Sequence, residues 1–371
     1  MGTLVKSKRF KLNTSLFYTI AILLLGVNYL LYRFWEIESL KNVMRGGAAL
    51  FLLLCIIVDK KKIKLTEVVL LIFAAYLIVI NGDVSANIGF LLLCAIAPVR
   101  NDNAVYKQIN KIQLCLTAVV LMMLATGLKS GVSYSFGSRR LRFTLGFDNV
   151  NAAAGFFFSV LVIWLYTRKS MNWWQAALAI GLVAALFIVT DSRTPFFASV
   201  CYFGVYWFTR YVKKKWFRRC YYWAAAVVML VSFLNRFLLS AFPSLDALLS
   251  LRLSLTADYM ASNSLFNLVL GGGKAVAVDN AYVDLLYNAG ILFYAFFVYA
   301  VLAASKFYLY SGSRKELSFI MSVLVFGLME SSFLRAELLF SVVFWILIIR
   351  PVVSRKQAVK KPAALTAVSC R

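Results

Sequence analysis

The sequence predicts an all-α protein, a polytopic integral membrane bundle of about twelve transmembrane helices. Three observations favour this class: the apolar composition, the length of the apolar runs and the placement of the basic residues. Of the 371 residues, 62% are hydrophobic and 15% are charged, whereas soluble domains contain roughly 45–50% apolar residues. The mean hydropathy is +0.80. Because every globule exposes much of its surface, only a lipid bilayer accommodates this much apolar surface.

The apolar runs give the order of the predicted spans. A transmembrane helix needs about 17–25 residues, and a few of the runs are shorter than that. Two long segments on the outer side, near 129–149 and 241–279, separate some of the spans. No linker and no change of composition divides the chain, so we expect residues 1–371 to form a single transmembrane domain. The predicted spans fall near 14–34, 42–58, 66–82, 84–99, 112–128, 150–167, 172–190, 194–210, 221–240, 280–305, 316–331 and 334–350.

The basic residues predict the orientation. With the N-terminus in the cytoplasm, the cytoplasmic side receives 28 of the 40 Lys and Arg residues but 4 of the 15 Asp and Glu residues. Basic loops are retained in the cytoplasm during insertion, so we expect both termini to be cytoplasmic. The net charge of +25 is then explained by topology, and we expect no nucleic-acid partner.

The titratable residues limit the chemistry. The chain has no histidine, which removes the commonest general base and metal ligand. Its six cysteines include no CxxC pair, so neither a disulfide framework nor a zinc site is indicated. We therefore expect no metal and no cofactor. Any catalysis must use carboxylates, arginines, tyrosines or the backbone.

Several cations lie on the outer side, where the insertion rule disfavours them. An unpaired charge deep in the membrane costs about 2.5–3.5 kcal/mol or more, so each needs a carboxylate partner or an anionic ligand. Asp191 could pair with Arg193, and Glu330 or Glu337 could pair with Arg335. The guanidinium fork matches phosphate oxygens, so a gathering of arginines at one membrane face favours a lipid-linked phosphate or diphosphate. These cations are Arg139, Arg140, Arg142, Arg193, Arg252, Lys274 and Arg335.

The segment VDNAYVDLLYNAG (278–290) contains the second candidate feature. In a helix, Asn280, Asp284 and Asn288 share one face, and Asp279 lies at its mouth. An apolar helix tolerates such a stripe where it faces a wet cavity or polar partners. Asp279 or Asn280 could instead be a plain N-cap, since both residue types cap helices well.

Two further segments carry weaker signals. In FDNVNAAAGFFF (147–158), Asp148 or Asn149 caps a helix and Asn151 points into the bundle. The small residues that follow also allow close helix packing. The sequence favours this packing role and a contact with substrate equally. The segment GGGK (271–274) is a poor match to a phosphate-binding P-loop and favours a turn or a close backbone approach.

Taken in order, these segments resemble the O-antigen ligase and polysaccharide polymerase superfamily over roughly residues 145–345. The pattern is a paired-asparagine element, an outer Ser-Arg, an outer loop with an arginine, a glycine-rich turn and an Asp-Asn-x-Tyr helix that ends in glycine. The ligase-like members carry histidine where this chain has Asp279, so it looks most like a capsular or exopolysaccharide repeat-unit polymerase. Val150 replaces the usual proline of the asparagine element. The matching residues are Asn149-Val150-Asn151, Ser192-Arg193, Arg252, Gly271–Gly273, Asp279-Asn280-Ala281-Tyr282 and Gly290.

The resemblance implies a multi-pass glycosyltransferase of the bacterial cytoplasmic membrane. It would join oligosaccharide repeat units carried on undecaprenyl diphosphate at the outer leaflet, beside membrane lipid, a flippase and a chain-length regulator as partners. Arg193 and Arg252 are expected to bind the diphosphate, and Asp279 to act as the base or to orient the attacking hydroxyl. The expected substrate-binding residues are Arg142, Arg335, Asn280, Tyr282, Asp284, Asn151 and Lys274.

Two other functions remain open at this point. A ligase would use the same donor with a different acceptor, which the sequence does not distinguish from a polymerase. A flippase for lipid-linked oligosaccharide also needs interior cations and about twelve spans. A flippase should place its cations in the middle of the bundle and show repeated halves, whereas here the cations crowd the outer ends of the predicted spans and no repeat is evident.

Overall fold

The computed structural model describes residues 14–58, 63–80, 82–97, 102–131, 133–134, 141–168, 170–248, 251–273 and 278–353. Within these ranges the chain is almost entirely helical, with one pair of short antiparallel strands. The helices are α1 (Thr14–Arg33), α2 (Lys41–Val58), α3 (Leu65–Val79), α4 (Asp83–Ile96), α5 (Asp102–Ala125), α6 (Val150–Thr167), α7 (Trp173–Thr190), α8 (Arg193–Phe208), α9 (Lys215–Leu230), α10 (Asn235–Ala241), α11 (Pro243–Leu248), α12 (Arg252–Ser262), α13 (Leu265–Leu270), α14 (Ala281–Ala289), α15 (Ile291–Ser311), α16 (Arg314–Gly327) and α17 (Leu339–Val353). The strands are β1 (Ser133–Tyr134) and β2 (Arg142–Phe143), and the 3-10 turns are η1 (Thr209–Tyr211), η2 (Val231–Leu234) and η3 (Ser331–Leu334).

The helices are long and apolar enough for a membrane protein. Seven stretches in the described part could cross a bilayer by length and composition. Three shorter apolar helices, α3, α4 and α17, accompany them. The chain is therefore an all-helical membrane protein, as the composition predicts. The seven stretches are Thr14–Arg33, Lys41–Val58, Asn103–Ala125, Val150–Thr167, Trp173–Thr190, Lys215–Leu234 and Ile291–Ser311.

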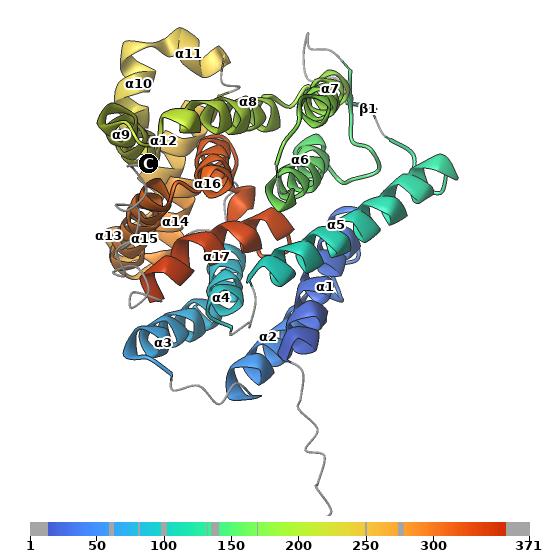
Figure 1. Cartoon of the computed structure of the whole chain (residues 1–371), viewed down its shortest axis with the longest axis horizontal. Helices are drawn as coiled ribbons and strands as arrows, with labels where there is room; N and C mark the ends of the chain where they lie inside the picture. Colours follow the sequence, from blue (N-terminus) through green and yellow to red (C-terminus); the bar gives the residue numbers. More distant parts are fainter. Residues whose placement is uncertain are drawn as a thin grey trace, which may run out of the picture.

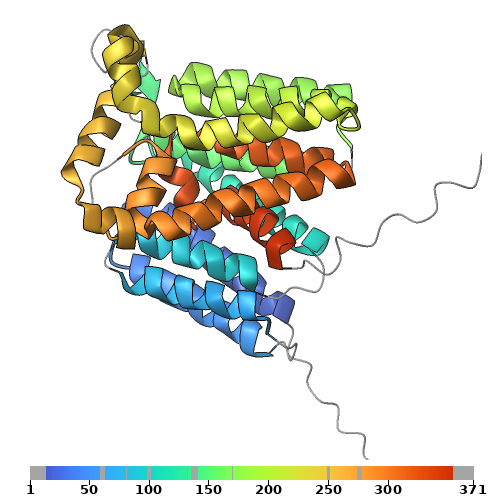
Figure 2. The same cartoon turned by 90° about the vertical axis from the view of Figure 1, so that its left-hand side faces the viewer.

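The long helices lie side by side, as Figure 2 shows, and the short helices α10 to α13 gather at one end of them. Two hydrogen bonds identify the helix ends that lie together at the opposite end of the bundle. The Thr14 carbonyl accepts a hydrogen bond from Cys55 Sγ at 3.3 Å, and the Val353 carbonyl accepts one from Lys64 Nζ at 2.8 Å. The start of α1, the end of α2, the start of α3 and the end of α17 therefore lie at one end of the bundle.

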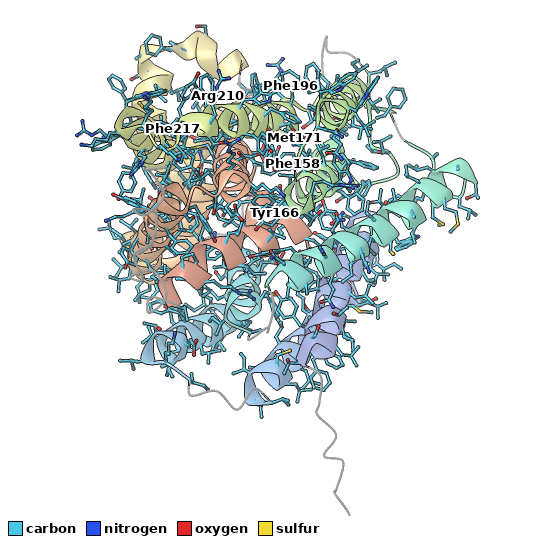
Figure 3. All side chains as sticks on the ribbon, viewed as in Figure 1. Phe158, Tyr166, Met171, Phe196, Arg210 and Phe217 are labelled. Carbon is cyan, nitrogen blue, oxygen red and sulfur yellow. The ribbon has the colours of Figure 1, made fainter. Side chains whose placement is uncertain are left out.

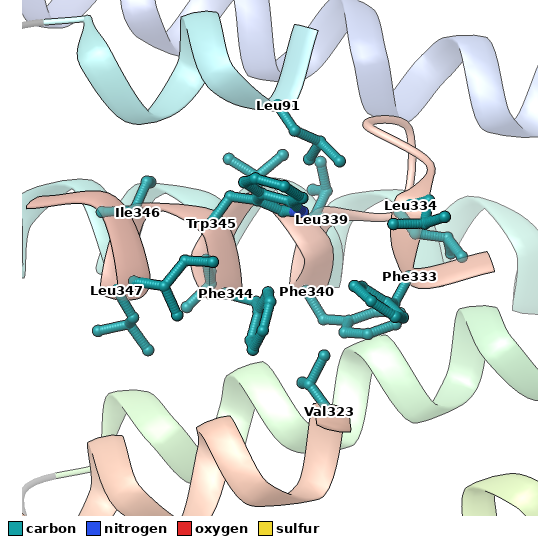
Figure 4. Close-up of a cluster of buried hydrophobic side chains, with 14 of the residues drawn as sticks. Leu91, Val323, Phe333, Leu334, Leu339, Phe340, Phe344, Trp345, Ile346 and Leu347 are labelled. Carbon is teal, nitrogen blue, oxygen red and sulfur yellow. The ribbon is translucent and has the colours of Figure 1, made fainter. Parts of the chain in front are cut away.

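Helix α17 is the centre of the core and lies between α4 and α16 (Figure 1). Every residue from Leu339 to Ile349 is buried, which is the behaviour of a helix that is apolar on all sides. Figure 4 shows Leu91 of α4 and Val323 of α16 on opposite sides of it. Its Trp345 is fully buried and stacks on Phe293 of α15 with the ring centroids 6.1 Å apart. Neighbouring helices therefore hold α17 on all of its sides.

Several predicted spans are interrupted in the structure. The run 280–305 is two helices, α14 and α15, because Gly290 adopts a left-handed φ of 82° between them. The run 334–350 begins as a helix only at Leu339, after η3 and an irregular link. The run 221–240 is divided among α9, η2 and α10. A left-handed glycine and short 3-10 turns therefore interrupt helices that the apolar pattern alone would extend.

The two long segments that are predicted to lie on the outer side contain regular structure that the sequence analysis did not predict. The region 241–279 holds α11, α12 and α13, and the region 129–149 holds β1 and β2. In the strand pair, Tyr134 lies opposite Arg142. The pairing matters for function because it fixes the backbone that carries Arg142.

The described glycines 271–273 form a turn that packs closely against the end of α14, as the sequence predicts. The backbone N–H groups of Gly272 and Gly273 donate to the carbonyls of Asn288 and Tyr287 at 3.1 and 2.9 Å. Any Cβ at Gly271, whose φ is +89°, would lie 2.6 Å from the Asn288 carbonyl oxygen. These carbonyls belong to the last turn of α14, where a helix leaves acceptors unsatisfied. The turn therefore holds α14 in place.

We expect Gly290→Ala to lower the free energy of unfolding by at least about 2 kcal/mol, since strained backbone alone costs roughly 1–3 kcal/mol. A Cβ there would also meet the Val269 carbonyl oxygen at 2.5 Å. Gly312→Ala is the control for φ alone, because Gly312 has φ +71° and open space around it. In detergent, the melting temperature of Gly290→Ala should lie well below that of Gly312→Ala. Equal melting temperatures would contradict the close contact.

Candidate functional site

A cavity of about 550 Å³ opens at the end of the bundle where α6 and α14 begin. Five of the ten residues that the sequence predicts for the site line it: Arg142, Asn151, Asp279, Asp284 and Arg335. They come from three separate regions of the sequence, 142–151, 279–284 and the link at Arg335. The complete lining is Tyr29, Arg33, Val84, Arg142, Asp148, Asn149, Val150, Asn151, Ala152, Val278, Asp279, Asp284, Glu330, Ser331, Ser332 and Arg335.

Arg335 is the cation of the cavity with the least local compensation. It lies in the link between η3 and α17, and its side chain is half-buried. Within the described residues, no carboxylate oxygen lies within 4.0 Å of its guanidinium. Of the two acidic partners that the sequence offers, Glu330 pairs with Arg252 and Glu337 pairs with Arg45. Arg335 is therefore available to an anion that enters the cavity.

The link that carries Arg335 is held firmly from the side of α4. The Ala336 backbone N–H donates to Asn87 Oδ1 at 3.1 Å. Next to it, Glu337 is 3% exposed and accepts from Arg45 Nε at 2.8 Å and from Asn28 Nδ2 at 3.0 Å. These contacts fix the backbone on the C-terminal side of Arg335, so its side chain has a defined origin.

Arg142 reaches the cavity from β2. Its Nε donates to the Thr190 carbonyl at 3.0 Å, at the end of α7, and its Nη2 lies 3.4 Å from Asn151 Oδ1. Asn151 stands in the first turn of α6, which Asn149 caps by accepting from the Ala152 N–H at 2.7 Å. Arg142 thus joins the strand pair to two helix ends, and Asn151 orients it.

Three of the four carboxylates of the cavity come from α14, from the residue before its N-cap and from the link before η3, and the fourth, Asp148, precedes α6. Asn280 is the N-cap of α14, so the capping role belongs to Asn280. Asp279, just before it, has a side chain that is 38% exposed, whereas Asp284 is buried and accepts from Asn288 Nδ2 at 2.8 Å. A carboxylate with an exposed edge at a cavity mouth can accept a proton from a bound hydroxyl.

Arg252 supports the cavity wall from behind and does not line it. Its Nη2 lies 2.8 Å from Glu330 Oε1, and its Nε lies 3.4 Å from Asp279 Oδ2. It also donates to the Met329 carbonyl and, at 3.2 Å, to Thr194 Oγ1. Its charge is already compensated by two carboxylates. The geometry therefore makes Arg252 the residue that positions Asp279 and Glu330.

The other predicted residues lie elsewhere. Arg193 is exposed at the start of α8 and does not line the cavity. Tyr282 is fully buried, and its hydroxyl donates to the Leu324 carbonyl at 2.5 Å, so it ties α14 to α16. Asn280 is occupied by its capping role. Lys274 lies outside the described residues.

Three charged residues of the cavity, Arg33, Asp148 and Glu330, were not predicted as site residues. Arg33, the last residue of α1, forms an ion pair with Asp148. Glu330 lines the cavity and forms an ion pair with Arg252. The only available signal was that each is a charge next to an apolar run, a property they share with residues outside the site.

Comparisons with protein-family models, with curated proteins and with solved structures give no match to this chain. The functional argument therefore depends on the cavity and its charges. Three arginines and four carboxylates line it. Arg33 is paired with Asp148, and Arg252 engages Asp279 and Glu330, so Arg335 faces the cavity with no carboxylate at ion-pair distance among the described residues.

Proposed function

We propose that the chain is a membrane glycosyltransferase that polymerises oligosaccharide repeat units linked to undecaprenyl diphosphate. The observation that carries the proposal is the half-buried Arg335, with no carboxylate within 4.0 Å in the described part, in one cavity with Arg142 and the partly exposed Asp279. Such a cavity offers guanidinium donors to a leaving diphosphate and a carboxylate to an attacking hydroxyl. It resembles what a repeat-unit polymerase requires.

The proposal includes the orientation of the chain. We place twelve spans in the membrane with both termini cytoplasmic, which follows the distribution of basic residues. In support, the first residue of α1, Thr14, and the last residue of α17, Val353, lie at the same end of the bundle. The cavity lies at the other end, and we assign it to the outer leaflet of a bacterial cytoplasmic membrane. A lipid-linked sugar could then enter it from the bilayer.

In the proposed reaction, a hydroxyl of one repeat unit attacks the anomeric carbon of a second glycan. The new glycosidic C–O bond forms as the C–O bond to the lipid diphosphate breaks, and the hydroxyl proton passes to Asp279. The leaving diphosphate gains negative charge, which Arg335 and Arg142 stabilise more strongly in the transition state than in the ground state. Arg252 keeps Asp279 at the cavity mouth through their ion pair. Undecaprenyl diphosphate is released.

Cells that lack the protein separate the three proposed classes of function. Loss of a repeat-unit polymerase leaves surface glycans one repeat long, whereas loss of a flippase leaves no surface glycan of that type. Loss of a ligase leaves long chains that stay on the lipid carrier. We expect the one-repeat glycan, read by gel electrophoresis of extracted surface polysaccharide. Either other pattern would reject the polymerase.

A further inference from the structure

A second cavity, of about 510 Å³, lies at the other end of α8 from Arg252. It is lined by Tyr206, Trp207, Phe208, Arg210 and Arg314. The 16 residues of α8 span about 24 Å, and their first turn, at Thr194, contacts Arg252. The second cavity is therefore separate from the proposed catalytic one by the length of a helix.

In the part of the chain that the structure describes, both arginines of this cavity lack an acidic partner. Arg210 follows the end of α8, and Arg314 is the first residue of α16. Among the described residues, neither has a carboxylate oxygen within 4.0 Å, and none of the five lining residues is acidic. The guanidinium of Arg210 lies 4.7 Å from the ring centroid of Tyr211, a contact that leaves its N–H donors available.

A neighbouring arginine shows what a structurally committed cation looks like here. Arg218 of α9 donates to the carbonyls of Val212 and Lys213 at 2.8 and 3.0 Å, and so ties down the turn between α8 and α9. Figure 3 marks this region by Arg210 and Phe217. Arg210 and Arg314 have no comparable side-chain hydrogen bond among the described residues. Both side chains are exposed, so their guanidinium groups are accessible to a ligand.

The walls of the cavity indicate the kind of ligand. Trp207 and Phe208 are 56% and 57% exposed on a helix that packs in an apolar membrane bundle. Tryptophan is enriched where the bilayer meets water, and basic pockets between helices bind lipid headgroups there. A guanidinium pair matches the oxygens of a phosphodiester, and the aromatic faces suit glycerol and the first methylene groups of acyl chains.

We propose that this cavity binds the headgroup of an anionic glycerophospholipid. Arg210 and Arg314 donate to its phosphate oxygens from two different elements, and Trp207 and Phe208 pack along its acyl chains. The lipid thereby bridges the end of α8 to the start of α16, the helix whose other end leads into Glu330 and η3. This site is independent of the glycosyltransferase assignment, and its test uses no sugar substrate.

Native mass spectrometry of the purified full-length protein in detergent tests the proposal. The protein is titrated with phosphatidylglycerol, with phosphatidylcholine of the same acyl chains, or with phosphatidylglycerol in excess inorganic phosphate. Basic residues near a membrane surface contribute about 1 kcal/mol each, so two arginines correspond to roughly 30-fold tighter binding of phosphatidylglycerol. We expect this preference in the unchanged protein, and we expect it to survive the inorganic phosphate.

The variants assign the preference to the cavity. In Arg210→Gln/Arg314→Gln, the affinities for phosphatidylglycerol and phosphatidylcholine should differ by no more than about twofold. The control Lys213→Gln/Lys214→Gln removes two exposed charges from the same end and should keep the full preference for phosphatidylglycerol. If the Gln pair does not fold, Arg210→Lys/Arg314→Lys keeps both charges without the fork and should reduce the preference partway. Equal binding of both lipids, equal loss in the control variant, or displacement by inorganic phosphate would overturn the proposal.

Discussion

Replacing Arg335 with alanine is expected to lower polymer formation by at least about 100-fold, with the fold unchanged. Removal of one preorganised donor to a developing negative charge typically costs 10²–10³ in rate. Arg335 makes no ion pair with the described residues and is half-buried at the cavity wall. Its loss therefore removes a cation from the substrate without breaking an ion pair among the described residues. Arg335→Lys should recover part of the activity, because lysine keeps the charge and loses the bidentate fork.

Two comparison variants make the result specific. Lys129→Ala removes a cation that pairs with Glu36 and does not line the cavity, and it should retain activity near that of the unchanged protein. Arg193→Ala separates the sequence-based assignment of the diphosphate site from the cavity-based one. Activity is measured as polymer length in cells and as product formed by the purified variant. Full activity in Arg335→Ala together with total loss in Arg193→Ala would refute the cavity-based assignment.

Replacing Arg45 with methionine is expected to lower the free energy of unfolding by about 3–5 kcal/mol, because it leaves a buried carboxylate without its counter-charge. Arg45 is 5% exposed and Glu337 is 3% exposed. Arg45 Nε lies 2.8 Å from Glu337 Oε1, and its Nη1 pairs with Asp83, which Lys41 Nζ also approaches at 2.8 Å. This cluster joins α2 and α4 to the link before α17. The same change should weaken activity, because that link carries Arg335.

A double-mutant cycle separates the pair from its parts. Arg45→Met/Glu337→Met should be more stable than Arg45→Met alone, since replacing both members of a buried ion pair with apolar residues removes the uncompensated charge. Chemical unfolding in mixed micelles, followed by tryptophan fluorescence, gives the two free energies. If the double variant is the less stable of the two, the instability of Arg45→Met does not come from the unpaired Glu337 carboxylate.

The sequence predicts the helices well because the solvent dictates them. A bilayer requires long apolar segments with their backbone bonds satisfied internally, and the predicted run 150–167 coincides with α6. Breaks within such runs are harder to predict. Gly290 interrupts the run 280–305 through its left-handed φ and its contact with Val269, and neither feature alters hydropathy.

The candidate site could be predicted only in part for a related reason. Arg142, Asn151 and Asp284 were identified as polar residues in or beside apolar runs, and they do line one cavity. Which arginine faces that cavity depends on ion pairs between distant segments. Arg252 and Glu330 are 78 residues apart, and Arg45 and Glu337 are 292 apart. Sequence spacing gives no access to such pairs, so Arg252 was expected to bind the diphosphate directly.

Incubation of the purified protein with a repeat unit linked to undecaprenyl diphosphate tests the central claim most directly. The reaction contains no nucleotide and no other enzyme, and the products are separated by length. We predict a ladder of glycans that differ by one repeat, with undecaprenyl diphosphate released in equal number to the bonds formed. Arg335→Ala should yield no ladder. If the native protein binds the lipid-linked repeat unit but leaves it unconverted, the account is contradicted.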